Sequence, residues 1–314
     1  LNVTNGAGAI TVNGTPGPNA LAVTPTGANT ASISVAGVSP LVNTTNAGSL
    51  TINEGNAGDG DSVVVNGTTA ADTINVSRGP STTVTVVGLK PITVTTAYIE
   101  ALTVAAGLGD VTINVSGSGG PALTVDGGLP TASDTLSITN NTAGATTVSP
   151  GATPDSGAVT TPDGAVSFLG IEGLTINGTA GVDTLAVLGT SDSDTLTAGP
   201  LAGNRVSVNN RAAITFTAIE NLSLQGRAGD DQLSVTPAGL AGVTAISVDG
   251  GDPTASDVLL VNGTTAGETL NFQPTGVDAG SVAVGAGPVV AFTTTESVVI
   301  NGQGGNDLLT VTTT

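Results

Sequence analysis

Aspartate and glutamate are the side chains of this sequence whose number and spacing could support chemistry. The sequence has 24 Asp and Glu residues but no His or Cys, which excludes imidazole and thiolate ligands, nucleophiles and bases. An acidic residue recurs just before short alternating patterns such as D-T-L-x-V. Because every donor would be an oxygen atom, the pattern favours calcium as a ligand. The candidate calcium ligands are Asp61, Asp72, Asp183, Asp192, Asp194, Asp230, Asp231, Asp257 and Asp307.

The same aspartates have an alternative role in which no ion is bound. An Asp at a turn accepts hydrogen bonds from nearby backbone N–H groups and so stabilises the turn by itself. Loops that follow one another at the same short step, such as those ending at Asp183 and Asp194 or at Asp257 and Glu268, could stack and bring carboxylates together. Stacked carboxylates without a counter-ion would repel one another, which favours at least some bound cation.

Composition and charge exclude several classes of function. The net charge of −19 disfavours binding to nucleic acid or to an anionic membrane surface. No run of 18 apolar residues occurs, so no membrane span is predicted. Only five basic residues are present, they occupy unlike repeat positions, and aromatic residues make up 2% of the chain. We therefore predict that the protein is not an enzyme, and in particular neither a polysaccharide lyase nor a glycosidase. The basic residues are Arg78, Lys90, Arg205, Arg211 and Arg227.

Internal repeats place the acidic residues at regular positions. The segment GGLPTASDTLSI at 127–138 recurs as GGDPTASDVLLV at 250–261. A Glu also heads four similar strand patterns, and an Asp follows each at a nearly constant distance. These pairs are Glu100 and Asp110, Glu172 and Asp183, Glu220 and Asp231, and Glu296 and Asp307. We predict one continuous repeat array over residues 1–314. Its approximate units are 1–66, 67–138, 139–188, 189–261 and 262–314.

The step between successive acidic positions accommodates one short strand and one turn rich in Gly, Asn and Thr. Further strands are predicted at 20–23, 32–35, 83–87, 205–208, 245–248 and 281–284, and strands rather than helices within 92–106 and 211–225. The predicted fold is all-β, an elongated parallel β-solenoid (β-helix) in which equivalent residues stack about 4.8 Å apart. The alternative is a row of tandem antiparallel β-sandwich modules.

Three loops carry a resemblance to a known family. GTAGVDTLA at 178–186, GRAGDDQLS at 226–234 and GQGGNDLLT at 302–310 resemble the calcium-binding nonapeptide of hemolysin-type (RTX) repeat proteins. Their second Gly is replaced by Thr179, Arg227 or Gln303. The wider pattern is similar to the repeat regions of large bacterial cell-surface proteins of the planctomycete kind. This resemblance implies an exported, stalk-like or adhesin-like role, with calcium held between loops of neighbouring coils.

These observations favour a non-catalytic structural protein of the cell exterior. We expect a rod or filament-forming segment of a cell-surface fibre or matrix, without nucleic acid as a partner. Both ends have strand-like sequences, and an uncapped solenoid end presents an open edge, so we expect head-to-tail joining with identical copies or continuation in a longer repeat chain. The alternative is an adhesin that binds glycan, or an ice-binding solenoid whose flat face uses the T-x-T patterns at 83–86, 93–96 and 310–313.

Overall fold

The protein folds into two compact units of short β-strands. The computed structural model describes residues 2–4, 6–53, 58–95, 97, 99–129, 133–199, 203–252 and 256–312. Unit 1 comprises Leu1–Asn141 with Asp163–Gly173, and unit 2 comprises Thr142–Pro162 with Leu174–Thr314. In the described residues the only helical element is one 3₁₀ turn, η1 (Pro237–Gly239), so none of them forms a helix that is long and apolar enough to cross a membrane.

The described residues of unit 1 form fifteen strands, most of them four to six residues long. They are β1 (Asn2–Thr4), β2 (Ala9–Asn13), β3 (Ala20–Gly27), β4 (Thr30–Val35), β5 (Val38–Thr45), β6 (Ser49–Asn53), β7 (Ser62–Asn66), β8 (Thr73–Arg78), β9 (Ser81–Val86), β10 (Ile92–Thr95), β11 (Ala101–Ala105), β12 (Thr112–Gly117), β13 (Ala122–Asp126), β14 (Thr135–Thr139) and β17 (Gly164–Leu169).

Unit 2 contains the other strands, of which β18 begins one residue before the unit does. They are β15 (Ala145–Pro150), β16 (Gly157–Thr161), β18 (Gly173–Asn177), β19 (Thr184–Leu188), β20 (Thr195–Ala198), β21 (Arg205–Val208), β22 (Ala213–Thr217), β23 (Asn221–Arg227), β24 (Gln232–Val235), β25 (Ala245–Gly251), β26 (Val258–Asn262), β27 (Thr269–Gly276), β28 (Ala279–Val284), β29 (Val289–Thr293), β30 (Ser297–Asn301) and β31 (Leu308–Val311).

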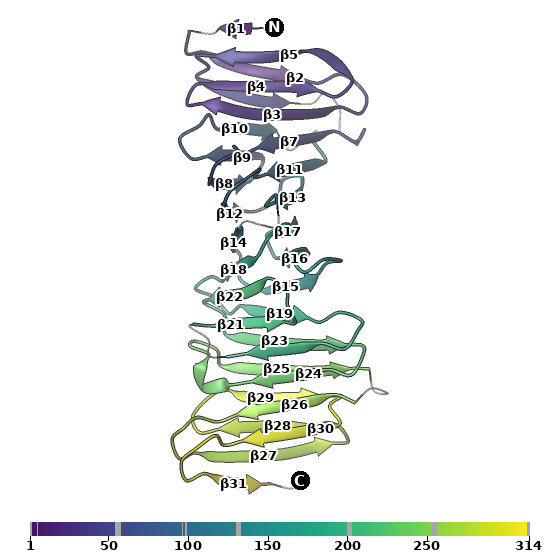
Figure 1. The fold of residues 1–314 in the computed structure, drawn as a ribbon, viewed down its shortest axis with the longest axis vertical. Helices are drawn as coiled ribbons and strands as arrows, with labels where there is room; N and C mark the ends of the chain where they lie inside the picture. Colours follow the sequence, from purple (N-terminus) through teal and green to yellow (C-terminus); the bar gives the residue numbers. More distant parts are fainter. Residues whose placement is uncertain are drawn as a thin grey trace. The chain divides into compact units, whose positions relative to one another are not determined.

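In unit 1 the chain alternates between two sheets (Figure 1). The first sheet has the order β1-β5-β4-β3-β7-β11-β13-β17. The second sheet has the order β2-β6-β10-β9-β8-β12-β14. From β11 to β14, successive strands lie in alternate sheets, and each pairs in parallel with the strand two places earlier or, for β11 and β12, four places earlier. This is the coil of a parallel β-solenoid.

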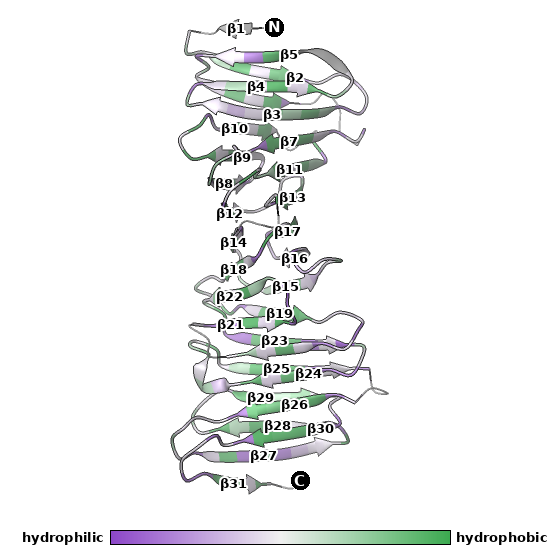
Figure 2. Cartoon of the chain, viewed as in Figure 1, coloured by the Kyte–Doolittle hydropathy of each residue, from purple (hydrophilic) through white to green (hydrophobic). Residues whose placement is uncertain are grey.

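Aliphatic side chains form columns in the interior between the two sheets. The register pairs Val63 with Leu102 and Leu102 with Leu123, and their side chains are 0%, 1% and 4% exposed. Figure 2 shows the hydrophobic residues distributed along the strands. Because β-branched residues favour extended backbone, and each buried aliphatic side chain contributes about 1.5–3 kcal/mol, these columns determine and stabilise the coil.

Antiparallel meanders interrupt the parallel coils. In unit 1, β3, β4 and β5 form a meander in the first sheet, and β8, β9 and β10 form one in the second. Short loops, 28–29 and 79–80, connect the first two strands of each. The meander of the first sheet carries the chain two strand positions backwards. The chain then passes through β6 and returns as β7, on the other side of β3.

Unit 2 repeats this arrangement. Its first sheet has the order β16-β15-β19-β23-β25-β29-β28-β27-β31. Its second sheet has the order β18-β22-β21-β20-β24-β26-β30. The hairpin β27–β28 has a β-bulge between Pro274 and Gly276, and the hairpin β3–β4 of unit 1 has one between Pro25 and Gly27. The two units are therefore copies of one design.

The structure confirms the predicted fold class and the predicted strands. The segments at 20–23, 32–35, 83–87, 205–208, 245–248 and 281–284 lie in or largely in strands, and 92–106 and 211–225 contain strands rather than helices. Within 92–106, residues 96 and 98 lie outside the described residues. In each unit the strands stack as a parallel β-solenoid rather than as sandwich modules. The antiparallel meanders were not predicted.

Candidate functional site

Rows of carboxylates lie at the start of the strands in both sheets of each unit. In each row, here termed an acidic ladder, the residue before a strand accepts a hydrogen bond from the backbone N–H of the equivalent residue on the neighbouring coil. In the first sheet of unit 1, Asn19 N–H donates to Asp61 Oδ1 at 2.7 Å, and Asp61 N–H donates to Glu100 Oε2 at 2.8 Å. Hydrogen bonds to an ionised acceptor are about twice as strong as neutral ones, so the ladders tie neighbouring coils together.

The first-sheet ladder recurs in unit 2. Gly144 N–H donates to Asp183 Oδ1 at 2.9 Å, and Asp183 N–H donates to Glu220 Oε2 at 2.8 Å. After the next meander, Glu268 N–H donates to Asp307 Oδ1 at 3.0 Å.

The second-sheet ladder of unit 2 is the longest run of carboxylates. Asp194 N–H donates to Asp231 Oδ1 at 2.7 Å, Asp231 N–H to Asp257 Oδ1 at 2.8 Å, and Asp257 N–H to Glu296 Oε2 at 2.6 Å. Asp231 and Asp257 are completely buried.

The ladders correct one expectation from the sequence. Asp183 and Asp194 were expected to stack because their loops follow one another at the regular step of the repeat. The chain changes sheet between them, so Asp183 precedes β19 of the first sheet and Asp194 precedes β20 of the second. Each instead bonds a residue 37 positions later, Glu220 and Asp231 respectively. A stacking partner is therefore found one coil away, not one strand away.

A Gly-Thr pair fixes the second oxygen of some ladder aspartates. Asp183 Oδ2 accepts hydrogen bonds of 2.7 Å from both the N–H and the hydroxyl of Thr179. Asp194 is held in the same way by Thr190, at 2.5 and 3.0 Å. The glycine before Thr179 is required by close approach, because a Cβ on Gly178 would lie 1.9 Å from the carbonyl oxygen of Ala218.

Hydrogen bonding and burial shift the pKa of ladder carboxyls in opposite directions. For Asp183, desolvation alone would raise the pKa, but the bonds from Thr179 and Gly144 outweigh it and the pKa is lowered. Backbone bonds from Gly58 and Asp61 lower the pKa of Glu100. These carboxylates are stabilised in their ionised form.

The second-sheet ladder shows the opposite effect. Desolvation, followed by the charges of Asp257, Asp194 and Asp230, raises the pKa of Asp231 to about 6. Desolvation also raises the pKa of Asp257 and, in unit 1, of Asp134. One oxygen of each of these three side chains, Oδ2, is buried without a hydrogen-bond partner.

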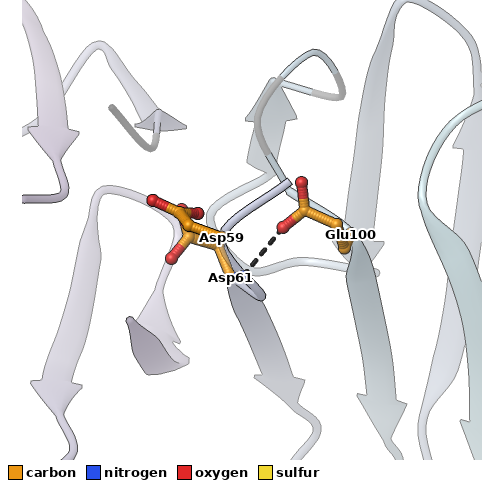
Figure 3. A group of neighbouring side chains, drawn as sticks. All are labelled: Asp59, Asp61 and Glu100. Carbon is orange, nitrogen blue, oxygen red and sulfur yellow. Dashed lines mark hydrogen bonds between the residues drawn. The ribbon is translucent and has the colours of Figure 1, made fainter. Parts of the chain in front are cut away.

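One group of three acidic side chains in the described residues is close enough to share an ion. Asp59, Asp61 and Glu100 of unit 1 have ligand atoms within 4.8 Å of one another (Figure 3). Both oxygens of Glu100 accept backbone N–H groups, from Gly58 at 2.7 Å and from Asp61 at 2.8 Å. Asp59 Oδ1 and Asp61 Oδ2, in contrast, are buried and have no hydrogen-bond partner. Two unsatisfied oxygen donors in one turn fit a hard cation.

The group includes only one of the predicted ligands, Asp61. The sequence analysis did not select Asp59, although it stands two residues before Asp61. It also did not select Glu100, which stands just before β11 on the neighbouring coil. Unit 2 has Gly181 at the position equivalent to Asp59, and within the part of the chain that the structure describes no second group of three acidic side chains lies this close together.

The remaining predicted ligands lie apart from this group. Asp72 Oδ2 accepts the N–H of Thr68 at 2.6 Å within its own loop. Asp192 and Asp230 are exposed, and Asp230 Oδ1 accepts the N–H of Ser256 at 3.1 Å. Asp307 lies on the last described coil. Calcium binding by these residues stays a prediction.

The last coil exposes apolar side chains that are buried elsewhere. On β31, Leu309 is 54% and Val311 is 56% exposed. Their equivalents on β19, Leu185 and Val187, are 0% and 1% exposed, because β23 covers β19. A hollow of about 270 Å³ lies between β27, β30 and β31, lined by Phe272, Val298, Ile300, Leu309 and Val311.

A row of hydroxyl side chains crosses the outer face of the second sheet in unit 1. The register aligns Thr11, Thr51, Thr93, Thr83, Ser77, Ser116 and Thr139 on adjacent strands. None of these side chains is buried. The row includes part of the predicted T-x-T face, whereas Thr96 and Thr313 lie outside the described residues.

No protein-family model matches the sequence, and no curated protein was found with significant similarity to it. The resemblance to hemolysin-type repeats and to bacterial surface proteins therefore stays a prediction.

Proposed function

We propose that the chain is a non-catalytic structural segment of an extracellular cell-surface fibre, whose coils stack on further coils of the same kind. The observation that carries this proposal is the last coil. Its apolar side chains are about half exposed, whereas the equivalent side chains inside unit 2 are completely covered by the next coil. A neighbouring coil, from a second copy or from a longer repeat chain, would bury them in the same way and satisfy the open strand edge.

The first residues of the sequence support stacking between copies. Residues 1–53 contain no charged side chain, although the chain as a whole carries −19. An uncharged first coil can approach the acidic ladder at Asp307 without the repulsion that any other coil of the chain would meet. The extracellular setting is supported by the resemblance to exported repeat proteins.

Electron microscopy and sedimentation of the purified chain test this assembly. We expect end-to-end particles whose number increases with concentration, and we expect Leu309→Lys to abolish them because it places a charge in the apolar hollow. Val182→Lys is the control, because Val182 is 68% exposed in a loop away from the last coil. Concentration-independent monomers of the unmodified chain, or an equal loss with both variants, would contradict stacking between copies.

We further propose that calcium stabilises unit 1 at Asp59 and Asp61. The support is the pair of buried, unpartnered oxygens, Asp59 Oδ1 and Asp61 Oδ2. Calcium at about one hundred times its dissociation constant would add about 2.7 kcal/mol to the stability of the unit. The unfolding temperature should be higher with calcium than with a chelator, and Asp59→Asn should remove this difference. Asp110→Asn, which removes one exposed charge of the same unit, should retain it; no calcium effect on the unmodified chain would refute the site.

A further inference from the structure

Unit 2 contains an open hollow that is lined by two arginines. Its volume is about 630 Å³, within the range of small-ligand sites. Three turns and the end of one strand form it. The turns are the one after β15 at Gly151, the one before β20 at Thr190–Ser193 and the one between β21 and β22 at Asn209 and Arg211; the strand end is that of β23 at Arg227. Arg211 and Arg227 lie at unlike positions of the repeat pattern, so no basic cluster is visible in the sequence.

The first arginine is held in place by backbone carbonyl groups. Arg211 Nη1 donates to the carbonyl oxygens of Gly151 at 3.0 Å and Thr153 at 2.9 Å. These two bonds fix the guanidinium at the wall of the hollow and leave its other N–H groups to bind a ligand. The turn after β15 therefore positions this residue.

The second arginine has no side-chain partner. Arg227 is exposed, and among the described residues its guanidinium forms no hydrogen bond and no ion pair. The hollow thus carries two guanidinium groups and one carboxylate, that of Asp192, and among the described residues neither arginine forms an ion pair, so a net positive charge is left there for an anion.

The backbone at Arg227 has a conformation that L side chains rarely adopt, as it does at Gln303, which occupies the same position of the last repeat loop with φ +70°. The φ angle of Arg227 is +87°, a conformation that favours glycine, and the equivalent residue of unit 1 is Gly107, with φ +99°. Arg211 likewise replaces an apolar residue, because NNRAAITF at 209–216 is equivalent to VGLKPITV at 87–94 and aligns Arg211 with Leu89. The two positions that hold Gly107 and Leu89 in unit 1 are thus both arginine in unit 2, where they line the same hollow. Residues kept in unfavourable backbone conformations cluster at functional sites.

The other side chains of the hollow suit a sugar. The hydroxyl groups of Ser191 and Ser193 can donate to sugar oxygens, and the carboxylate of Asp192 can accept hydrogen bonds from sugar hydroxyls. The hydroxyl of Thr190 and the amide of Asn209 already donate to Asp194 and shape the hollow rather than bind the ligand. A guanidinium binds a carboxylate or sulfate through two parallel hydrogen bonds. We infer that this hollow binds an acidic carbohydrate, with its carboxylate or sulfate on Arg211 and Arg227 and its hydroxyl groups on the surrounding polar side chains.

The net charge limits the length of such a ligand. The ladder carboxylate of Asp194 lies directly behind the hollow, because it accepts hydrogen bonds from Thr190 and Asn209 of the lining. Acidic residues more than about 8 Å from a bound oxyanion are largely screened at physiological ionic strength. A long polyanion would extend beyond the hollow along an acidic surface and be repelled. The site therefore favours short oligosaccharides or single acidic residues within neutral chains.

Titration calorimetry of the full chain with three trisaccharides tests the inference. We expect binding of trigalacturonate, of a sulfated trisaccharide or of both, and none of neutral maltotriose; the two acidic ligands distinguish a carboxylate from a sulfate site. Arg211→Gln and Arg227→Gly should each weaken binding about tenfold or more. Arg78→Gln removes a basic side chain of unit 1 and should leave the affinity unchanged.

Arg227→Gly separates binding from folding. Glycine adopts positive φ without strain, so this variant should unfold at the same temperature as the unmodified chain or higher. Loss of binding together with unchanged or increased stability would establish that Arg227 serves the ligand. Equal binding of the neutral and acidic trisaccharides, no binding of either acidic one, or full affinity in Arg227→Gly would overturn the inference. None of these outcomes depends on end-to-end stacking.

Discussion

Units 1 and 2 differ in the residues that fill an equivalent corner of the second sheet. The residue before β24 in unit 2 is Asp231, whereas the residue before β12 in unit 1 is Val111. Both side chains are buried, with exposed fractions of 0% and 1%. The preceding corner residue differs as well, because Gly226 of unit 2 corresponds to Ala106 of unit 1. A Cβ on Gly226 would lie 2.2 Å from Asp231 Oδ2.

The difference shows that the coil does not require a carboxylate at this position. In unit 1 an apolar pair fills the corner, and in unit 2 a glycine makes room for an acid. The acid binds the N–H of Asp194, but its second oxygen is buried without a partner and its pKa is raised to about 6. Unit 2 thus carries a local electrostatic cost that unit 1 avoids.

The largest expected effect concerns a corner at which the two units agree. A Cβ on Gly127 of unit 1 would lie 1.8 Å from the carbonyl oxygen of Gly170, and a Cβ on Gly250 of unit 2 would lie 1.9 Å from that of Thr294. Because backbone has to move in both cases, Gly127→Ala and Gly250→Ala should each reduce the free energy of unfolding by about 3 kcal/mol. Urea unfolding measures this loss.

Gly6→Ala is the control for both variants, because a Cβ on Gly6 would meet no atom within 4 Å. If the two corner variants differed from each other by more than the control differs from the unmodified chain, the units would not be structurally equivalent at this corner.

A smaller effect is expected where the units differ. Asp231→Asn keeps an acceptor for the N–H of Asp194 and removes the buried charge, so it should stabilise the protein at pH 7.5 by about 1–2 kcal/mol. The benefit should decrease at pH 5, because Asp231 of the unmodified chain then binds a proton in the folded state. Stability of the unmodified chain should accordingly rise as the pH falls from 7.5 to 5, through the raised pKa of about 6.

Asp183→Asn should have the opposite effect on stability from Asp231→Asn, within the same unit. The pKa of Asp183 is lowered, so its carboxylate contributes stability that is present at neutral pH and is lost as the pH falls below about 4. This variant should be less stable than the unmodified chain at pH 7.5. Urea unfolding of both variants at pH 7.5 and 5 makes the comparison, and destabilisation by Asp231→Asn at pH 7.5 would show that the ionised ladder is needed.

The strands and their parallel stacking could be predicted from the sequence because aliphatic alternation and the recurrence of 127–138 at 250–261 are local or periodic signals. The meanders were missed although the short connection at 28–29 is a hairpin signal. A constant step between strands does not reveal whether the next strand turns back.

The candidate sites were harder to predict, because they depend on which coils become neighbours. Asp183 stood out in the sequence by its repeat position, but its hydrogen-bonded partner Glu220 lies 37 positions away. Arg211 and Arg227 belong to different turns, and only the folded coil brings them to one hollow. Arg227 carried one signal in the sequence, since it replaces a glycine of the repeat loop.

The meanders also determine how a unit would respond to mechanical load. In a simple solenoid, a pulled end peels off one strand after another. In the first sheet of unit 2, β29 lies between β25 and β28, and β27 separates β28 from β31. Tension at the C-terminal end would first detach β31 and β30. It would then act on the meander β27–β28–β29, whose hydrogen-bonded strands would have to separate together. Each meander would thus resist unfolding when a unit is stretched.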